Sequence, residues 1–219
     1  MFLTALDADT GHEEGATYLW SYGELEEILG DEGLAAIKEV YDVSEGGNFE
    51  GKNHLVRLSH KNLPELEEKL LEARLEREQP EADTKILCGI NALVSIGLLQ
   101  AGKCLESGEY AEEAVSLVGS ILATFWDGKR LAHCLSGGIL QERSFLFDAA
   151  ALLAAVAMIA AEDPIWLGTL DELKGYIQTF RDGEGWVESR GEDFHHVPAP
   201  VSDHPVPSST SLALFALAS

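Results

Sequence analysis

One helix-length run of apolar residues limits what this chain can fold into. From Phe145 to Ala161 every residue except Asp148 is apolar, so a helix here must be covered on all sides. The run is slightly short for a membrane span and rich in weakly hydrophobic Ala, and we interpret it as a core helix. Because an unpaired buried charge is costly, Asp148 should be buried and hydrogen-bonded. It is a candidate ligand-binding residue, or else a structural Asp that bonds the backbone of a neighbouring loop.

Apolar positions recur at helical spacing along most of the chain. Ser21 and Glu24 fit a capping box at the start of the first helical segment. The pattern predicts an all-α fold with short β-hairpins in the loops. We expect helices over residues 24–41 (two short ones), 63–78, 86–101, 107–126, 145–161, 163–180 and from 208 onward, and strand-like segments at 16–20, 54–58, 130–136 and around Trp186.

Composition excludes several kinds of partner. The 219 residues carry a formal net charge of −23, which argues against nucleic acids and anionic membrane surfaces, both of which bind clustered Lys and Arg. The chain has only three cysteines and no CxxC motif, which is typical of proteins in a reducing compartment. No signal peptide is visible at the N-terminus. We expect a single cytoplasmic domain over residues 1–219.

An acidic, glycine-rich stretch near the N-terminus is the first candidate site. Gly11 and Gly15 allow tight turns around a cluster of carboxylates, and such loops often carry function. The alternative is a solvated acidic turn, which is common in proteins. The candidate side chains are Asp7, Asp9, Glu13 and Glu14, followed by Trp20.

Two motifs carry a family resemblance. Leu6–Trp20, LDADTGHEEGATYLW, resembles the LDADSxGxEEGxFYVW segment of the thioredoxin-domain-containing proteins typified by bacterial YyaL and the spermatogenesis-associated thioredoxin-like protein. Gly47–Leu55, GNFEGKNHL, resembles the GNxEGKNIL of that family. Weaker matches follow in the same order as the motifs of that family, at residues 83–91, at residues 182–186, and at Asp203 with Pro207-Ser208.

The resemblance implies a fold and a set of site residues. The large domain of that family belongs to the six-hairpin-glycosidase-like (α/α) toroids, so the chain is expected to be a toroid of helical hairpins with a carbohydrate- or polyol-binding pocket, epimerase- or glycosidase-like. The thioredoxin module is absent, and no redox function carries over. The implied catalytic set is Asp9, Glu14 and Asp203, and the implied ligand-binding residues are Asp7, Glu13, Trp20, Asn91, Asp148 and Trp186. The acidic loop is expected within roughly 10 Å of Asp203, the outer range for cooperating carboxyls.

A non-catalytic scaffold is the alternative function, because several family motifs are altered here. The family SWNG is replaced by Gly89–Ala92, which lacks the Trp, and its PSGNS by Pro207–Ser211, which lacks the Gly and Asn. Asn91 could be a core amide that bonds loop backbone, and both tryptophans could simply pack. No cofactor or metal is expected, because the only His-rich cluster, Asp193–His196 with Asp203 and His204, offers adjacent histidines, which are a poor ligand pair.

The number of helices bears on partners. A six-hairpin toroid needs twelve helices by family resemblance, and the pattern predicts about six long ones and two short ones. The final helix is apolar, with no Gly or Asn cap. We therefore expect an open arc that exposes an apolar patch and associates with itself or with remaining segments of a longer parent chain.

Overall fold

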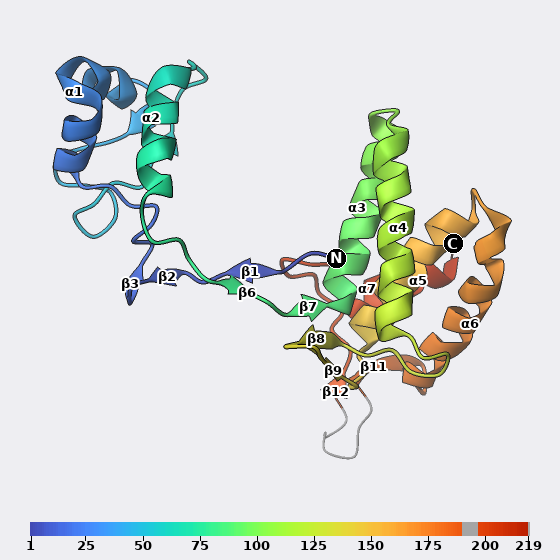
Figure 1. Ribbon diagram of the computed structural model, residues 1–219. Coiled ribbons are helices and arrows are strands. Elements are labelled where there is room, and N and C mark those ends of the chain that lie inside the picture. Colours follow the sequence, from blue (N-terminus) through green and yellow to red (C-terminus); the bar gives the residue numbers. More distant parts are fainter. Residues whose placement is uncertain (190–196, 219) are drawn as a thin grey trace. The chain divides into compact units, whose positions relative to one another are not determined.

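The computed structural model describes residues 1–189 and 197–218, and the chain divides into two compact units (Figure 1). The α1–α2 unit is Ala5–Asp83. The α5 unit combines Met1–Thr4 with Thr84–Ser219. Each unit is described by itself, and the single domain expected over residues 1–219 stays a prediction.

The α1–α2 unit contains two helices and three small antiparallel strand pairs. The helices are α1 (Tyr22–Lys38) and α2 (Pro64–Leu75). The strand pairs are β1 (Ala5–Leu6) with β6 (Ala82–Asp83), β2 (Asp9–Thr10) with β3 (Glu13–Glu14), and β4 (Tyr41–Asp42) with β5 (Val56–Arg57).

Local signals explain where α1 begins and breaks. The Ser21 hydroxyl accepts the Glu24 amide, and the Glu24 carboxylate accepts the Ser21 amide, which confirms the capping box. Gly30 has φ 66°, a left-handed value that interrupts the helix, as the expected pair of short helices requires. The expected strand at 16–20 is wrong. This segment is mostly turn, with only a single bridge from Trp20 to Asn53, because the positive φ of Gly15 starts a turn there.

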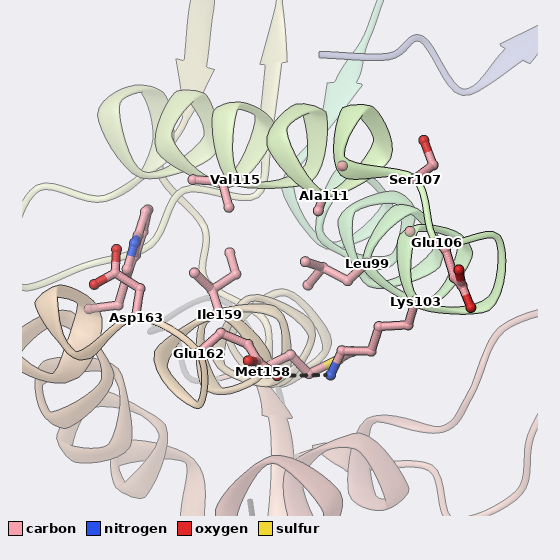
Figure 2. Close-up of a pocket in the computed structure, with 13 residues that line it drawn as sticks. Leu99, Lys103, Glu106, Ser107, Ala111, Val115, Met158, Ile159, Glu162 and Asp163 are labelled. Carbon is pink, nitrogen blue, oxygen red and sulfur yellow. Dashed lines mark ion pairs between the residues drawn. The ribbon is translucent and has the colours of Figure 1, made fainter.

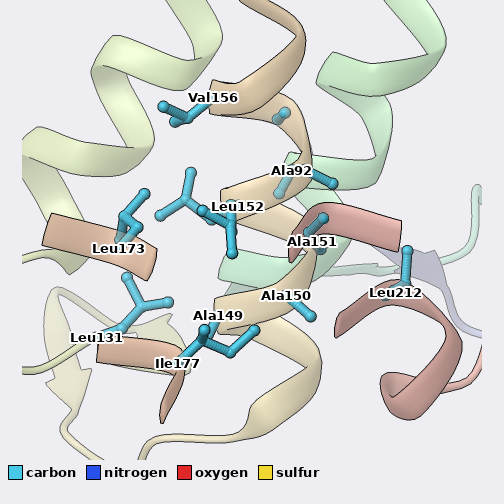
Figure 3. Packing of buried hydrophobic residues seen from close by; sticks show 14 of the residues in the cluster. Ala92, Leu131, Ala149, Ala150, Ala151, Leu152, Val156, Leu173, Ile177 and Leu212 are labelled. Carbon is cyan, nitrogen blue, oxygen red and sulfur yellow. The ribbon is translucent and has the colours of Figure 1, made fainter. Parts of the chain in front are cut away.

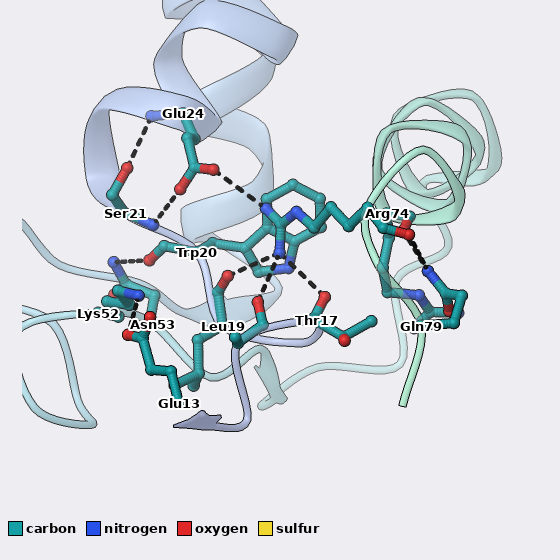
Figure 4. A network of polar contacts seen from close by, with 12 residues as sticks. Glu13, Thr17, Leu19, Trp20, Ser21, Glu24, Lys52, Asn53, Arg74 and Gln79 are labelled. Atoms are coloured by element: carbon teal, nitrogen blue, oxygen red, sulfur yellow. Dashed lines mark hydrogen bonds and ion pairs between the residues drawn. The ribbon is translucent and has the colours of Figure 1, made fainter. Parts of the chain in front are cut away.

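An arginine holds this unit together. Arg77 donates to the carbonyl oxygens of Thr17 (2.9 Å) and Leu19 (2.8 Å), and its guanidinium lies 3.8 Å from the ring centroid of Trp20. The same side chain pairs with Glu24 at 3.3 Å, so it ties the loop before α1 to the start of that helix (Figure 4). A small apolar cluster completes the unit, made by Trp20, Leu25, Leu29, Leu34, Ile37, Val43 and Leu70.

In its described residues the α5 unit contains five α-helices and two three-stranded sheets. The helices are α3 (Cys88–Cys104), α4 (Gly108–Phe125), α5 (Leu146–Ala160), α6 (Leu167–Ile177), α7 (Ser209–Ala218) and the 3₁₀ turns η1 (Pro164–Trp166) and η2 (Gln178–Phe180). One sheet has the order β7 (Ile86–Leu87), β8 (Cys134–Ser136), β9 (Ile139–Gln141), and the other has β10 (Arg181–Asp182), β11 (Gly185–Ser189), β12 (Val197–Pro198).

Helix α5 is the centre of this unit, as the apolar run predicts. Its side chains are buried along almost the whole length, and it contacts α3, α4, α6 and α7 (Figure 3). Seven of its residues are Ala, so neighbouring backbones can approach closely, while Leu152, Leu153 and Val156 fill the spaces between them. The packed faces of the surrounding helices contribute Ile121, Leu173, Ile177 and Ala213 among others.

The all-α toroid is a wrong prediction. Helices hold about 50% of the residues, but 17% lie in strands that form five small sheets, so the fold is mixed α/β. The helical periodicity was read correctly for most segments. The error lies in the polar, glycine-rich connections, where strands of two to five residues pair with one another. In strands this short, the alternation of apolar and polar residues is too brief to be recognised in the sequence.

Among the described residues, no helix has both the length and the apolar character that crossing a bilayer requires. Helix α5, the most apolar, is instead covered by the rest of its unit.

Candidate functional site

The one acidic residue of the apolar run, Asp148, lies in the first turn of α5 and is fully buried. Its Oδ1 accepts the backbone amide of Gly89 at 2.8 Å, and its Oδ2 lies 2.8 Å from Nδ1 of His133. The expectation that Asp148 is buried and bonded is confirmed. Burial raises the pKa of Asp148, and the bonds from His133 and Gly89 oppose that rise.

Gly89, in the first turn of α3, makes the approach to Asp148 possible. A Cβ at this position would lie 2.6 Å from ring carbons of Phe147 and 2.7 Å from Oδ1 of Asp148. Any side chain would therefore push the start of α3 away from the start of α5 and break the amide–carboxylate bond.

His133 is held by both backbone and side chain. Its carbonyl accepts the Cys88 amide at 2.9 Å, and its own amide donates to Gln141 at 3.1 Å. Its ring makes an edge-to-face contact with Phe145, with centroids 4.7 Å apart. The hydrogen bond with Asp148 raises the pKa of His133. Because Asp148 occupies Nδ1, Nε2 is the ring nitrogen left for a ligand.

Glu188 lies beside His133 at an irregularity in β11. The pairing register between β11 and β12 shifts between Val187 and Ser189, and such bulges redirect a side chain. Glu188 Oε1 accepts the Phe147 amide at 3.2 Å, whereas Oε2 is buried without a hydrogen-bond partner in the described part of the chain. Burial raises the pKa of Glu188, with opposition from the Ser209 side chain and the Phe147 amide. A buried oxygen of this kind favours a protonated carboxyl.

His133 and Glu188 line one cavity of about 320 Å³. Its other described lining residues are Phe145, Phe147, Pro200, Ser202, His204, Val206, Pro207, Ser208 and Ser209. Proton-transfer groups with shifted pKa values in a concave, largely apolar space are the usual marks of an active site.

Asp203 lies beside this cavity without lining it. Its Oδ1 accepts the Ser208 amide at 2.9 Å, just before α7 begins. The Ser208 hydroxyl in turn accepts the Ser211 amide at 3.1 Å, so it caps the helix. Asp203 thus holds the loop that forms one wall of the cavity.

The acidic residues near the N-terminus all belong to the α1–α2 unit. Asp9 pairs with Glu14 across the β2–β3 hairpin, and both side chains are exposed. Asp7 accepts the Asp9 amide at 3.1 Å, and Glu13 forms an ion pair with Lys52. The structure does not fix the placement of this unit relative to Asp203, so the expected convergence of the two loops stays a prediction.

The remaining sequence candidates have well-defined surroundings. The buried Asn91 amide bonds the backbone of Phe2 in both directions (2.6 and 3.0 Å) and also donates to Leu87, which favours the loop-holding alternative. Trp186 is 7% exposed with Arg181 over its ring, and Trp20 is 3% exposed beneath Arg77. Neither indole face is open for stacking.

Asp193–His196 lie outside the described residues, and elsewhere no group of three His, Cys, Asp or Glu is placed to hold a metal ion.

Sequence reasoning missed His133 and Glu188. His133 lies among apolar residues, between Ala132 and Cys134. An isolated polar residue in an apolar segment is the signal that marks Asp148, and it marks His133 as well. Glu188 is followed by Ser189 and Arg190 in the sequence, so the same signal does not mark it.

A second, larger cavity of about 420 Å³ lies between the α3–α4 turn and the end of α5. Leu99, Val115, Met158 and Ile159 form its walls, and Lys103 and Glu162 pair at 3.5 Å across its edge (Figure 2). The carboxylates that line it, those of Glu106, Glu162 and Asp163, are exposed, so it offers less acid–base chemistry than the His133 cavity.

Comparisons with known proteins add a distant relative. No protein-family model matches the chain. An uncharacterised protein of Caenorhabditis elegans, B0495.5, is 24% identical over 97% of this chain. The match covers 36% of that protein, so the chain spans about a third of the length of this relative.

Proposed function

We propose that the α5 unit binds a sugar-like, polyhydroxyl ligand in the His133 cavity and catalyses proton transfer on it, as epimerases and glycosidases do. The observation that carries this proposal is the pairing of two differently held acid/base groups at one cavity. His133 is oriented by Asp148, and Glu188 keeps one buried oxygen without a partner among the described residues.

The two groups suit complementary roles. Asp148 fixes the imidazole through Nδ1, so Nε2 of His133 can accept a proton from a ligand hydroxyl or an acidic C–H. Burial raises the pKa of Glu188, which suits it to donate a proton to a ligand oxygen. The set of Asp9, Glu14 and Asp203 implied by the family resemblance remains a separate prediction, because this mechanism does not require it.

A turnover assay tests the proposal. The chain is incubated with monosaccharides in D₂O and with aryl glycosides, and deuterium incorporation, change of configuration and aryl release are followed. His133→Asn and Glu188→Gln should each lower the rate by about 10²-fold or more, the usual contribution of a general acid or base. The matched controls are His60→Asn and Glu184→Gln, two exposed positions that are not among the described lining residues of the cavity. Activity that survives both His133 and Glu188 variants would refute the assignment.

A scaffold is the second candidate function, and a specific observation favours it. A carboxylate accepts a backbone amide at or just before the start of three helices: Asp148 at α3, Glu188 at α5 and Asp203 at α7. A purely structural role predicts that Glu188→Gln, which keeps the amide acceptor, changes neither ligand binding nor activity. The same variant thus separates the two candidates.

We also infer the setting and partners. No disulfide joins the three cysteines, all of which lie in the described part of the chain, and this supports a cytoplasmic location. The net charge of −23 argues against nucleic acid and anionic membranes as partners.

Leu214 and Phe215 of α7 are each 54% exposed, which supports self-association or docking of further segments of a longer parent chain. Sedimentation of the chain at several concentrations tests this.

A further inference from the structure

The His133 cavity carries an unusual balance of charge for a site that handles sugars. Among its described lining residues there is no Lys or Arg, and the titratable ones are His133, His204 and Glu188. Phosphate and carboxylate groups are normally bound by Arg, Lys or a free helix N-terminus. The described cavity lining therefore offers an anion no permanent positive charge.

The nearby helix N-terminus is already occupied. Asp203 accepts the Ser208 amide, and the Ser208 hydroxyl accepts the Ser211 amide, so two of the first donors of α7 are taken. A carboxylate at this position also places negative charge where an anionic ligand would have to bind. The charge of His133 is matched by Asp148 behind it, so the pair adds no net positive charge.

The rest of the lining suits an uncharged ring. Phe145, Phe147, Pro200, Val206 and Pro207 offer apolar surface for C–H faces, and the exposed Ser202 offers a hydroxyl. The volume of about 320 Å³ lies at the lower end of the roughly 300–1,000 Å³ typical of small-molecule sites. A single ring fits that size better than an oligosaccharide does.

We propose that the cavity takes one uncharged monosaccharide and discriminates against sugar phosphates and uronic acids. This inference rests on the proposed function and narrows its substrate class. Glu188 binds a ligand hydroxyl, the His133–Asp148 pair adds no net positive charge, and the Asp203 carboxylate beside the cavity opposes an added negative charge.

Paired ligands test the charge preference. Binding of D-glucose, D-mannose and N-acetyl-D-glucosamine to the whole chain is measured by calorimetry or saturation-transfer NMR, next to their 6-phosphates and D-glucuronate. At least one neutral sugar should bind, and its phosphorylated partner should bind at least about tenfold more weakly. Glu188→Gln should weaken the neutral sugar about tenfold, whereas Glu184→Gln should leave its affinity unchanged. A 6-phosphate that binds as tightly as its neutral partner would overturn the inference.

A gain of charge gives an independent check. Ser202 is an exposed lining residue, so Ser202→Arg adds a cation at the cavity wall with little risk to the core. The variant should reduce the preference for the neutral sugar by about tenfold, and Ser202→Gln serves as the control for side-chain size. An unchanged preference in Ser202→Arg would count against an electrostatic origin.

The two proposals fail in different ways. If a sugar phosphate binds well and its binding depends on His133 and Glu188, the charge inference is refuted and the proposed function stands. If no sugar of either kind binds, both are refuted.

Discussion

The two units of this protein are stabilised in different ways. In the α5 unit one apolar helix is covered by four others, and the carboxyl groups of Asp148 and Glu188 accept backbone amides at the starts of α3 and α5. In the α1–α2 unit a small apolar cluster is supplemented by Arg77, which lies on Trp20 and bonds a turn. The fraction of its surface that a unit buries on folding rises with the size of the unit. A small unit therefore relies more on specific polar bonds than a large one does.

The comparison also suggests where function lies. Titratable groups with raised pKa values, a cavity and a buried carboxyl without a partner in the described residues occur together in the α5 unit. The carboxylates of the β2–β3 hairpin are exposed, and one of them is paired with a lysine. A rigid core can hold strained or unpaired groups that a small, polar unit cannot.

The largest expected effect concerns the α5 core. Leu152→Ala removes a fully buried side chain from the middle of α5 and should lower the free energy of unfolding by about 2–5 kcal/mol, because it leaves a cavity. Urea unfolding measures the loss. Leu71→Ala, on the exposed face of α2, is the control and should stay within about 0.5 kcal/mol. Equal losses in the two variants would contradict the contrast between the units.

Arg77→Ala should have the next largest effect and should act on the α1–α2 unit alone. It strands the carbonyl oxygens of Thr17 and Leu19 and uncovers Trp20, with a cost of about 2–3 kcal/mol. Hydrogen exchange resolved by segment should show faster exchange in residues 5–83 and unchanged exchange in α5. Lys69→Ala, on the exposed face of α2, is the matched control. Faster exchange throughout the chain would mean that the units unfold together.

Asp148→Ala should lower the free energy of unfolding by about 1–3 kcal/mol, because the Gly89 amide and His133 Nδ1 lose their acceptor. Asp148→Asn can still accept the amide and should cost less. Chemical unfolding compares the two variants. If both leave stability unchanged, Asp148 contributes only to the site and not to the α5 core.

The smallest effect is a difference in pH dependence between the units. In the α5 unit the pKa of His133 is raised by its bond with Asp148, so the stability it contributes is complete below the unfolded value of 6.5 and is lost as pH rises through the folded pKa. In the α1–α2 unit burial of Glu24 is outweighed by bonds from Ser21 and the charge of Arg77, so its pKa is lowered. The stability from Glu24 is present above 4.5 and lost as pH falls through the folded pKa.

Segment-resolved hydrogen exchange, corrected for the intrinsic effect of pH, measures these opposite slopes. His133→Asn should flatten the loss in the α5 unit above neutral pH, and Arg77→Ala should weaken the acid-side loss in residues 5–83. Parallel slopes in both units would show that the overall negative charge, rather than these local bonds, controls the response to pH.

Much of this fold could be predicted from the sequence, and the failures have a physical cause. The buried helix at 145–161, the capping box at Ser21 and the break at Gly30 follow from local patterns. The small sheets do not, because most of their strands have only two or three residues, and some of these pair with partners far along the chain, as when β7 pairs with β8.

Only part of the candidate site could be predicted from the sequence, for the same reason. Asp148 stands out in one apolar helix, but its partner His133 and the amide of Gly89 come from two other segments. Glu188 reaches the cavity through a bulge that no local pattern encodes. Sequence alone can flag a buried polar residue, whereas the identity of its partners depends on tertiary packing.

The contact between Gly89 and Asp148 constrains how this protein can diverge. With no room for a Cβ at position 89, glycine there and the carboxylate at position 148 depend on each other. A lineage that keeps the carboxylate must keep the glycine, whereas loss of the carboxylate alone still leaves the Phe147 ring 2.6 Å from any Cβ at position 89. Relatives as distant as 24% identity can therefore be sorted by this pair together with His133 and Glu188, so that four positions distinguish relatives that retain the residues of the proposed site from those that retain only the helices.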